Sequence, residues 1–345
     1  LEDIAMAKKL AECIGTELVG SITHSTQLDY EGMEISTGDF FDLAVSDAVF
    51  LIDGAVETTH PVAGFLINKA HFDGAKLIAM GPNESKFDRT ADLRIRNKRG
   101  THSALLGALS GDLEMAKAVK IAGIEEVEIE KIKKILESAD NPIIVYAAED
   151  TPVGSFGDRA LIAKIADKFG QKVILLSGEA NALGLRGILG KSEKLGKAIM
   201  NGEIQAVISF GEDPEGFSEG ALGKIIAVAD FLPTKTTEAA KIVLPLAAFG
   251  EIEGTFVNAL GEMAEMTPAF KPPSAMQNRE MMAQICRAMG VTDTDFDIAF
   301  ELPENKAEYP IDQKWFVDNP PRMAVPGDSL ARYIAKLKRE NKIAH

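Results

Sequence analysis

Short apolar and β-branched runs alternate with segments of helical periodicity along most of this 345-residue chain. The alternation predicts an α/β fold with parallel sheets, because the connection between two parallel strands has to cross a face of the sheet and is usually a helix. Helix-ending signals such as Asp73–Gly74 and Gly170 fall between the runs. The expected strands are Ala48–Asp53, Lys76–Gly81, Asp92–Arg96, Ile143–Ala148, Lys172–Ser177, Ala206–Gly211, Ile225–Leu232 and Ile242–Leu246.

The order of these segments predicts two doubly wound parallel-sheet domains with a junction near residue 125. The first domain is expected to comprise residues 1–125 and the second residues 126–291. The opening helix, Asp3–Ile14, has no strand before it. We therefore assign residues 1–20 to the second sheet domain, and expect the missing strand either in a partner chain or in a trimmed part of the sequence. Residues 292–345 contain repeated prolines and a terminal helical pattern, and we expect this extended tail to dock on a partner.

The net charge and the length of the apolar runs disfavour several classes of function. The formal net charge is −15 at pH 7, which disfavours binding to nucleic acid and to anionic lipid surfaces. No apolar run approaches the roughly 20 residues that a membrane-spanning helix needs. The start of the chain does not have the pattern of a secretory signal, so we expect a cytoplasmic protein.

Cysteine content limits the cofactors. The chain has two cysteines, Cys13 and Cys286, whereas an iron–sulfur cluster normally takes four thiolates. Its five histidines are scattered and lack metal-ligand spacing. We therefore expect neither a cluster nor a metal in this chain. Cys13 has helical spacing with Leu10 and Met6, which is typical of a core residue.

Ligand-binding loops are expected after the strands, because parallel sheets bind ligands at the carboxyl ends of their strands. No strand is followed by GxGxxG or by GxxxxGK[ST], so the residues leave open whether these loops bind a nucleotide-like ligand or are tight turns. The candidate loops are Asp53–Pro61, Gly81–Lys86, Ser177–Gly190 and Gly211–Pro214.

Evidence for catalysis in the residues themselves is sparse. His24 and His60 lie on expected loops, where either acid–base chemistry or a structural hydrogen bond would explain them. Glu251 and Glu253 would face the same way in an extended segment, so that they either bracket a ligand or form a solvated turn. The residues alone predict a fold and no active site.

Between Ile208 and Asn258 the sequence is distinctive. It reads SFGEDPEG and then DFLPTKTTEAAKIVLPLAAFGEIEGTFVN, and it closely resembles the late segment of the molybdopterin-dinucleotide oxidoreductases. That family includes formate dehydrogenase catalytic subunits and the large iron–sulfur subunit of NADH:quinone oxidoreductase. The earlier segments SDAVFLIDGAVETTHP and GEANALGLRGILG resemble further parts of the family pattern. The resemblance spans Asp3 to Gly290, and it implies the two central α/β domains of that family without its cluster-binding domain.

The residues that match the family pattern most clearly are Gly211, Glu212, Asp213, Pro214, Asp230, Thr234 and Lys235. The resemblance implies that these seven form a vestigial half of a pterin-dinucleotide site. Thr23, followed by His24, stands at the position of the family's metal-ligating cysteine. Because a hydroxyl resists deprotonation far more than a thiol, we expect no metal ligand there. The loop DGAVETTHP retains His60 and Pro61 but lacks the Asn–Pro of the family loop.

The resemblance and these departures predict a non-catalytic scaffold or docking subunit of an NADH-, formate- or ferredoxin-linked electron-transfer complex. No cofactor is expected in this chain, and iron–sulfur clusters and flavin are expected on partner subunits. One alternative is a catalytic molybdenum or tungsten pterin oxidoreductase of the formate dehydrogenase type, with His24 near the substrate. The other is a regulatory module that binds a nucleotide at the half-site.

Overall fold

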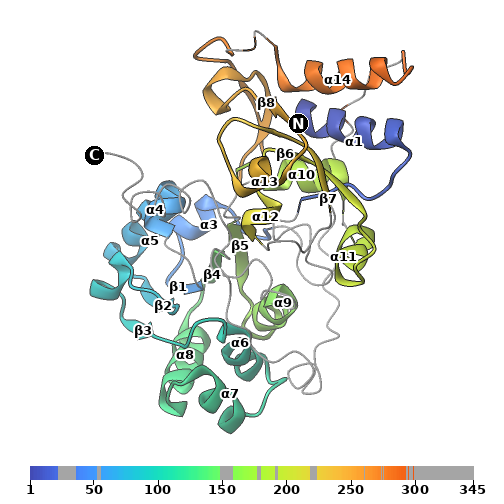
Figure 1. Ribbon diagram of the computed structural model, residues 1–345. Helices are drawn as coiled ribbons and strands as arrows, with labels where there is room; N and C mark the ends of the chain where they lie inside the picture. The colour runs from blue at the N-terminus through green and yellow to red at the C-terminus, as the bar shows by residue number, and fades with distance from the viewer. Residues whose placement is uncertain are drawn as a thin grey trace, which may run out of the picture. The chain divides into compact units, whose positions relative to one another are not determined.

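The computed structural model describes residues 1–21, 36–52, 56–147, 158–176, 180–190, 193–217, 224–259, 261–272, 274, 276–292, 294 and 298 (Figure 1). The described residues fall into two compact units. Unit 1 is built from residues 1–21 and from residue 180 onward, and unit 2 from residues 36–176.

Unit 2 is organised around a parallel sheet, and its described part has five strands in the order β3-β2-β1-β4-β5. Ala48 at the start of β1 lies opposite Lys76 on one side and Pro142 on the other. The chain therefore winds outward from β1 in both directions, which is a doubly wound topology. The strands are β1 (Ala48–Ile52), β2 (Lys76–Met80), β3 (Leu93–Ile95), β4 (Pro142–Ala147) and β5 (Lys172–Leu176).

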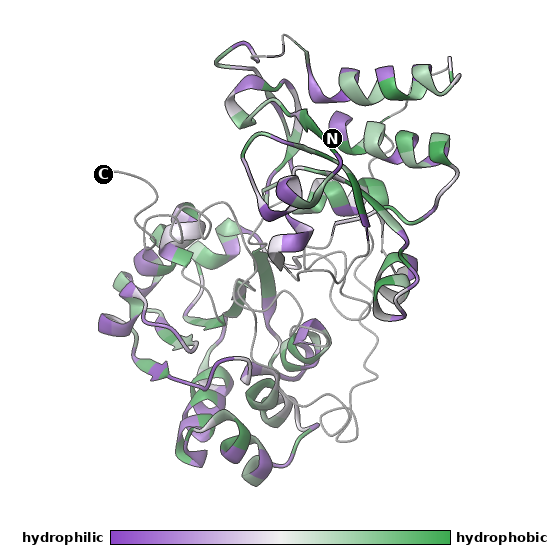
Figure 2. Ribbon diagram, in the orientation of Figure 1, coloured by the Kyte–Doolittle hydropathy of each residue, from purple (hydrophilic) through white to green (hydrophobic). Residues whose placement is uncertain are grey.

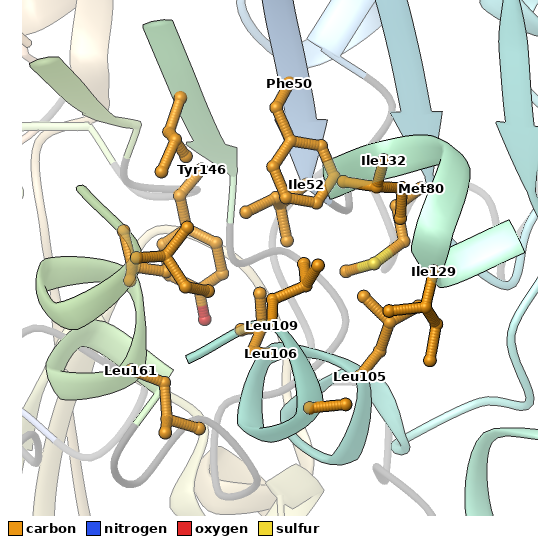
Figure 3. Close-up of a cluster of buried hydrophobic side chains, with 14 of the residues drawn as sticks. Phe50, Ile52, Met80, Leu105, Leu106, Leu109, Ile129, Ile132, Tyr146 and Leu161 are labelled. Atoms are coloured by element: carbon orange, nitrogen blue, oxygen red, sulfur yellow. The ribbon is translucent and has the colours of Figure 1, made fainter. Parts of the chain in front are cut away.

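Helix α6 lies at the centre of unit 2, and all of its residues from His102 to Leu109 are buried. Its leucines meet side chains from the sheet and from α8 and α9 in one continuous core (Figure 3). Figure 2 shows α6 as predominantly hydrophobic, whereas α7 and α8 mix hydrophobic and hydrophilic residues. The helices of unit 2 are α3 (Phe40–Ala44), α4 (Val56–Thr59), α5 (Pro61–Phe72), η1 (Lys86–Arg89), α6 (His102–Ser110), α7 (Met115–Ala122), α8 (Glu126–Ser138) and α9 (Asp158–Phe169).

The first sheet extends beyond the junction expected near residue 125. β4 pairs with β1 and β5 pairs with β4, so both strands belong to the first sheet and not to the second. The segment around residue 125 leads into α8, whose Ile129, Ile132 and Leu136 are buried while its other face is charged. This helix therefore belongs to the connection between β3 and β4 of one sheet, and the order of the segments alone did not distinguish it from a boundary between domains.

Unit 1 contains a smaller parallel sheet, with three strands in its described part in the order β6-β7-β8. An antiparallel pair, β9 and β10, follows it in the chain and was not among the expected elements. The strands are β6 (Ala206–Phe210), β7 (Lys224–Asp230), β8 (Ile242–Pro245), β9 (Gly254–Val257) and β10 (Met263–Met266). The helices are α1 (Glu2–Ile14), α10 (Ala182–Leu189), α11 (Glu193–Met200), α12 (Pro214–Phe217), α13 (Lys235–Ala239), η2 (Phe249–Glu251) and α14 (Asn278–Ala288).

The opening helix α1 packs within unit 1, beside α14 (Figure 1). Met6 and Leu10 lie in a buried cluster with Met282. At the start of the same helix, Ala5 packs with Val257 of β9. Helix α1 therefore connects α14 to the β9–β10 pair.

Glu2 at the start of α1 is bound to β9. Thr255 donates its backbone N–H to Glu2 Oε2 at 2.7 Å and its hydroxyl to Oε1 at 2.8 Å. Burial opposes ionisation of this carboxyl, but the hydrogen bonds from Thr255 prevail and lower its pKa from the ordinary value of 4.5 to about 2.

This low pKa predicts a loss of stability in acid. A depressed carboxyl pKa stabilises the fold fully above about pH 4.5, and the stabilisation disappears as the pH falls towards 2. After a discount for solvent screening we expect Glu2 to contribute about 2 kcal/mol at pH 7. Urea unfolding should show Glu2→Gln less stable than the parent at pH 7, with the difference shrinking below pH 4. A difference that is the same at pH 3 and pH 7 would contradict the assignment.

Candidate functional site

The carboxyl edge of the unit 1 sheet brings together the two loops expected to form a half-site. The strands β6, β7 and β8 are parallel, so their carboxyl ends lie along the same edge. Gly211–Pro214 follows β6, and Asp230–Lys235 begins at the last residue of β7. The structure thus places the seven expected residues on two adjacent loops.

The first loop begins with a sharp turn at Gly211. Its φ of 68° lies in the left-handed region that favours glycine, and its N–H donates to Ala229 O at 2.8 Å. In the next residue, the Glu212 carboxylate accepts a hydrogen bond from the Ser21 hydroxyl, and the Glu212 carbonyl accepts one from Ser209 Oγ at 2.9 Å. The turn therefore presents the backbone of the loop at the sheet edge while Glu212 is held by Ser21.

Asp213 joins the first loop to the second through Thr236. Asp213 Oδ1 accepts hydrogen bonds from the Thr236 N–H at 2.9 Å and from its hydroxyl at 2.7 Å. The same hydroxyl accepts from the Glu215 N–H at 3.0 Å, and Thr236 is fully buried. One threonine side chain thus links the start of α12, where Pro214 is the first residue, to α13. A Cβ at Gly216 would lie 2.0 Å from Asp213 Oδ2, so glycine leaves room for this carboxylate.

Asp230, at the end of β7, is partly buried beside Asp213. Its Oδ1 accepts the N–H groups of Phe231 and Leu232 at 2.7 and 3.2 Å. Burial raises the pKa of Asp230, and the neighbouring Asp213 charge raises it further, while the two backbone N–H groups partly offset the shift. The carboxylate therefore lies where an additional positive or N–H donor group would be favourable.

Thr234 and Lys235 form the start of α13. Thr234 is the N-cap: its side chain accepts the Thr237 N–H at 3.2 Å, and its own N–H donates to Thr237 Oγ1 at 2.8 Å. Lys235 is exposed at the first position of the helix. Of the seven expected residues, Thr234 thus caps a helix, and Lys235 is the one with a positively charged side chain.

The other candidate loops have different settings. In the loop after β2, the carbonyls of Gly81 and Asn83 accept hydrogen bonds from the Arg94 guanidinium at 2.9 and 2.7 Å. His60 is the N-cap of α5, and its Nδ1 lies 3.0 Å from Thr59 Oγ1. Asp53, Thr23 and His24 lie outside the described residues.

The pair Glu251 and Glu253 does not act as one unit. Glu251 accepts the Ala248 N–H at 2.9 Å, whereas Glu253 binds the Arg279 guanidinium at 2.6 Å. Each carboxylate therefore has a structural partner of its own.

Four tertiary contacts were not expected from the sequence. Ser21 and Thr236 both bind carboxylates of the half-site, and neither is among the seven residues expected to form it. In unit 2, His102 Nε2 lies 2.6 Å from Asp158 Oδ2, with side chains that are 1% and 0% exposed. The Tyr146 hydroxyl also donates to Asp158, at 3.2 Å. The sequence signal for this pair was that each residue begins a helix in a parallel α/β pattern.

Two searches of the described ranges bear on the class of protein. No three His, Cys, Asp or Glu side chains come together there in a way that would hold a metal ion. None of the helices in the same ranges combines the length and apolarity needed to cross a bilayer.

Comparison with known proteins identifies two sequence relatives that are named as dehydrogenase or oxidoreductase subunits, and one structural relative. It is 28% identical to the G subunit of NADH-quinone oxidoreductase from Pseudomonas putida, over 45% of this chain and 19% of that protein. It is 22% identical to the alpha subunit of a formate dehydrogenase of Methanococcus maripaludis, over 80% of this chain and 52% of that protein. In structure it resembles acetylene hydratase from Pelobacter acetylenicus, with a TM-score of 0.55 and 13% identity over 84% of this chain and 51% of the hydratase.

These matches cover only part of each relative: the chain spans about half the length of the formate dehydrogenase protein and about a fifth of the NADH-quinone oxidoreductase protein. The family itself is matched over most of this chain, because the molybdopterin oxidoreductase model aligns with residues 1–287. The family resemblance and the α/β class predicted from the sequence are confirmed. The chain belongs to the molybdopterin oxidoreductase family.

Proposed function

We propose that this chain is a non-catalytic scaffold or docking subunit of a multi-subunit electron-transfer complex linked to NADH, formate or ferredoxin. The iron–sulfur clusters and the flavin of this complex are bound by its partner subunits. The observation that carries this proposal is the position of its two cysteines. Both Cys13 and Cys286 pack between α1 and α14 in unit 1, where each fills a place in an apolar cluster. Among the residues that the structure describes, neither thiol joins a group of His, Asp or Glu side chains that could hold a metal ion.

The mostly negative charge of the half-site also supports a non-catalytic role. A pterin dinucleotide presents N–H donors on its rings and negative charge on its pyrophosphate. Glu212, Asp213 and Asp230 are acceptors suited to the ring donors, whereas Lys235 is the one cation of the two loops. Carboxylates beside a pyrophosphate repel it, so these residues fit the ring end of such a group and not its phosphate end.

The residue at the family's metal-ligand position also supports a non-catalytic role. Thr23 stands where the family pattern has a cysteine, and a threonine hydroxyl is a poor ligand because it stays protonated at neutral pH. These residues do not fit a complete pterin dinucleotide with a protein-bound metal. Both of the compared sequence relatives are named as subunits, which is consistent with a chain that works in an assembly.

One observation favours a second function, a regulatory module that binds a purine nucleotide. Asp230 is a partly buried carboxylate whose pKa is raised by burial and by Asp213. A guanine-type base would place N–H donors against it and relieve the repulsion between the two carboxylates. The phosphates of the nucleotide would then extend toward solvent near Lys235.

Elemental and nucleotide analysis of the natively purified assembly tests these functions together. We expect iron from partner subunits and neither molybdenum nor tungsten in proportion to this chain. Stoichiometric molybdenum or tungsten with released pterin, assignable to this chain, would overturn the scaffold proposal. Released guanine nucleotide without either metal would favour the regulatory module. Asp230→Asn in the same assembly is the matched variant, because it should abolish nucleotide binding and leave a scaffold intact.

A further inference from the structure

The two cysteines of the chain lie at the same end of two adjacent helices. Cys13 is the penultimate residue of α1, and Cys286 is in the last turn of α14. At the opposite end, the Asp3 carboxylate accepts the Arg279 N–H at 3.1 Å and the Asn278 side-chain amide at 3.3 Å. With their amino ends joined through Asp3, the two helices run in the same direction, side by side (Figure 1).

The surroundings of the two thiols differ. Cys286 is fully buried in the cluster that includes Met6, Leu10 and Met282, while Cys13 is partly exposed and packs against the edge of that cluster. Burial raises the pKa of the Cys286 thiol to about 11, and the adjacent Cys13 thiol contributes to the shift. The two side chains are therefore neighbours, and Cys13 is the more accessible of the two.

We propose that Cys13 and Cys286 form a redox modification site, at which a small-molecule disulfide converts the two thiols into an intramolecular disulfide that ties α1 to α14. This function is independent of the scaffold role, because it concerns the packing inside unit 1. It also uses the whole thiol content of the chain, so the reaction has one possible intramolecular product.

The reaction proceeds by two exchanges. The accessible Cys13 thiolate attacks one sulfur of the oxidant, the sulfur–sulfur bond of the oxidant breaks, and one thiolate leaves and takes up a proton. Cys286, after giving its proton to solvent, attacks the Cys13 sulfur of the mixed disulfide and displaces the second thiolate. Two protein thiols lose two electrons, and one oxidant disulfide becomes two thiols.

Burial of Cys286 sets the rate of closure. Because the protonated thiol is not nucleophilic, we expect the second exchange to accelerate about tenfold for each pH unit between pH 7 and pH 9. Once formed, the cross-link joins residues far apart in the sequence. It restrains the unfolded chain and holds α1 on α14, so both the melting temperature and the protection of the α1 amides should rise.

The test uses the full chain, with oxidised glutathione as the probe at pH 8. We expect the loss of both thiols per chain, a protein lighter by two hydrogen atoms, and a peptide joining Cys13 to Cys286 in non-reducing mass spectrometry. Dithiothreitol should restore the thiols and the original hydrogen exchange of α1. Recovery of intermolecular dimers, of glutathione on both cysteines, or of two unreacted thiols would overturn the proposal.

Two variants check the order of the steps. Cys286→Ser should stop at glutathione bound to Cys13, since the accessible thiol still reacts and no second thiol follows. Cys13→Ser should leave Cys286 unmodified, because that thiol is buried. Cys286→Ala keeps the packing apolar and gives the same readout should the buried serine prevent folding. Equal modification of the single cysteine in both variants would contradict the assigned order.

Discussion

Replacing Asp158 by alanine is expected to lower the free energy of unfolding of unit 2 by about 4 kcal/mol. Asp158 Oδ2 lies 2.6 Å from His102 Nε2 in the interior, and it also accepts the Tyr146 hydroxyl at 3.2 Å. Without the carboxylate, the Tyr146 hydroxyl loses its acceptor and His102 loses its close contact with a carboxylate, at a position that is closed to water. The shortened side chain also leaves a cavity next to α6 and β4. Urea unfolding followed by circular dichroism measures the effect.

Two further variants test whether the loss of stability comes from the contact between His102 and Asp158 or from substitution in general. Tyr146→Phe removes one neutral hydrogen bond and should cost about 1 kcal/mol. Lys117→Ala removes an exposed pair with Glu114, 3.0 Å apart, and should cost less than about 0.5 kcal/mol. In a double-mutant cycle, Asp158→Ala combined with His102→Ala should cost clearly less than the sum of the single changes. Additive costs would show that the contact between His102 and Asp158 contributes little.

The second large effect is expected at the half-site. Thr236→Val keeps the volume of the side chain but removes a hydroxyl that donates to Asp213 at 2.7 Å and accepts from the Glu215 N–H at 3.0 Å. Because Thr236 is fully buried, water cannot replace these partners. We expect a loss of about 3 kcal/mol of stability in unit 1, since one of the two hydrogen bonds is to a charged group. Thermal unfolding and proteolysis of the loop after β6 report this change.

The neighbouring threonine is a matched control. Thr237 has the same side chain in the same helix, and its hydroxyl also makes two hydrogen bonds: it donates to the Thr234 carbonyl at 2.7 Å and accepts the Thr234 N–H at 2.8 Å. Both of these partners are uncharged, and Thr237 is partly exposed, so that water can replace them. Thr237→Val should therefore cost about 1 kcal/mol. If the two valine variants are equally stable, Asp213 does not depend on Thr236, and the two loops are held together in some other way.

Local patterns in the sequence predicted most of the elements correctly. The run Ala48–Asp53 was expected as a strand, and Ala48–Ile52 is one, with every residue buried. The opening helix was expected to end at Ile14, and it does so, with Gly15 as its C-cap at a φ of 82°. These features depend on residues a few positions apart, so that periodicity and cap residues are sufficient to identify them.

The assignment of strands to sheets did not follow from such patterns. Pro142–Ala147 has the same apolar composition as a strand of either sheet, and its pairing with β1 depends on the core that α6 and α8 complete. The ligand-binding role of the seven half-site residues remains a proposal. The ordered motifs placed these residues on adjacent loops, but did not reveal that Thr236 and Ser21 hold two of their carboxylates.

The sequence by itself determined the family, the α/β class, a content of only two cysteines and the positions of the loops Gly211–Pro214 and Asp230–Lys235 after their strands. These properties are carried by residue types and by spacings along the chain. The tertiary structure decided which strands share a sheet, that His102 meets Asp158, and that Cys13 lies against Cys286. These contacts join residues that are far apart in the sequence. They arise from the joint burial of whole helices and strands, which no local pattern of residues specifies.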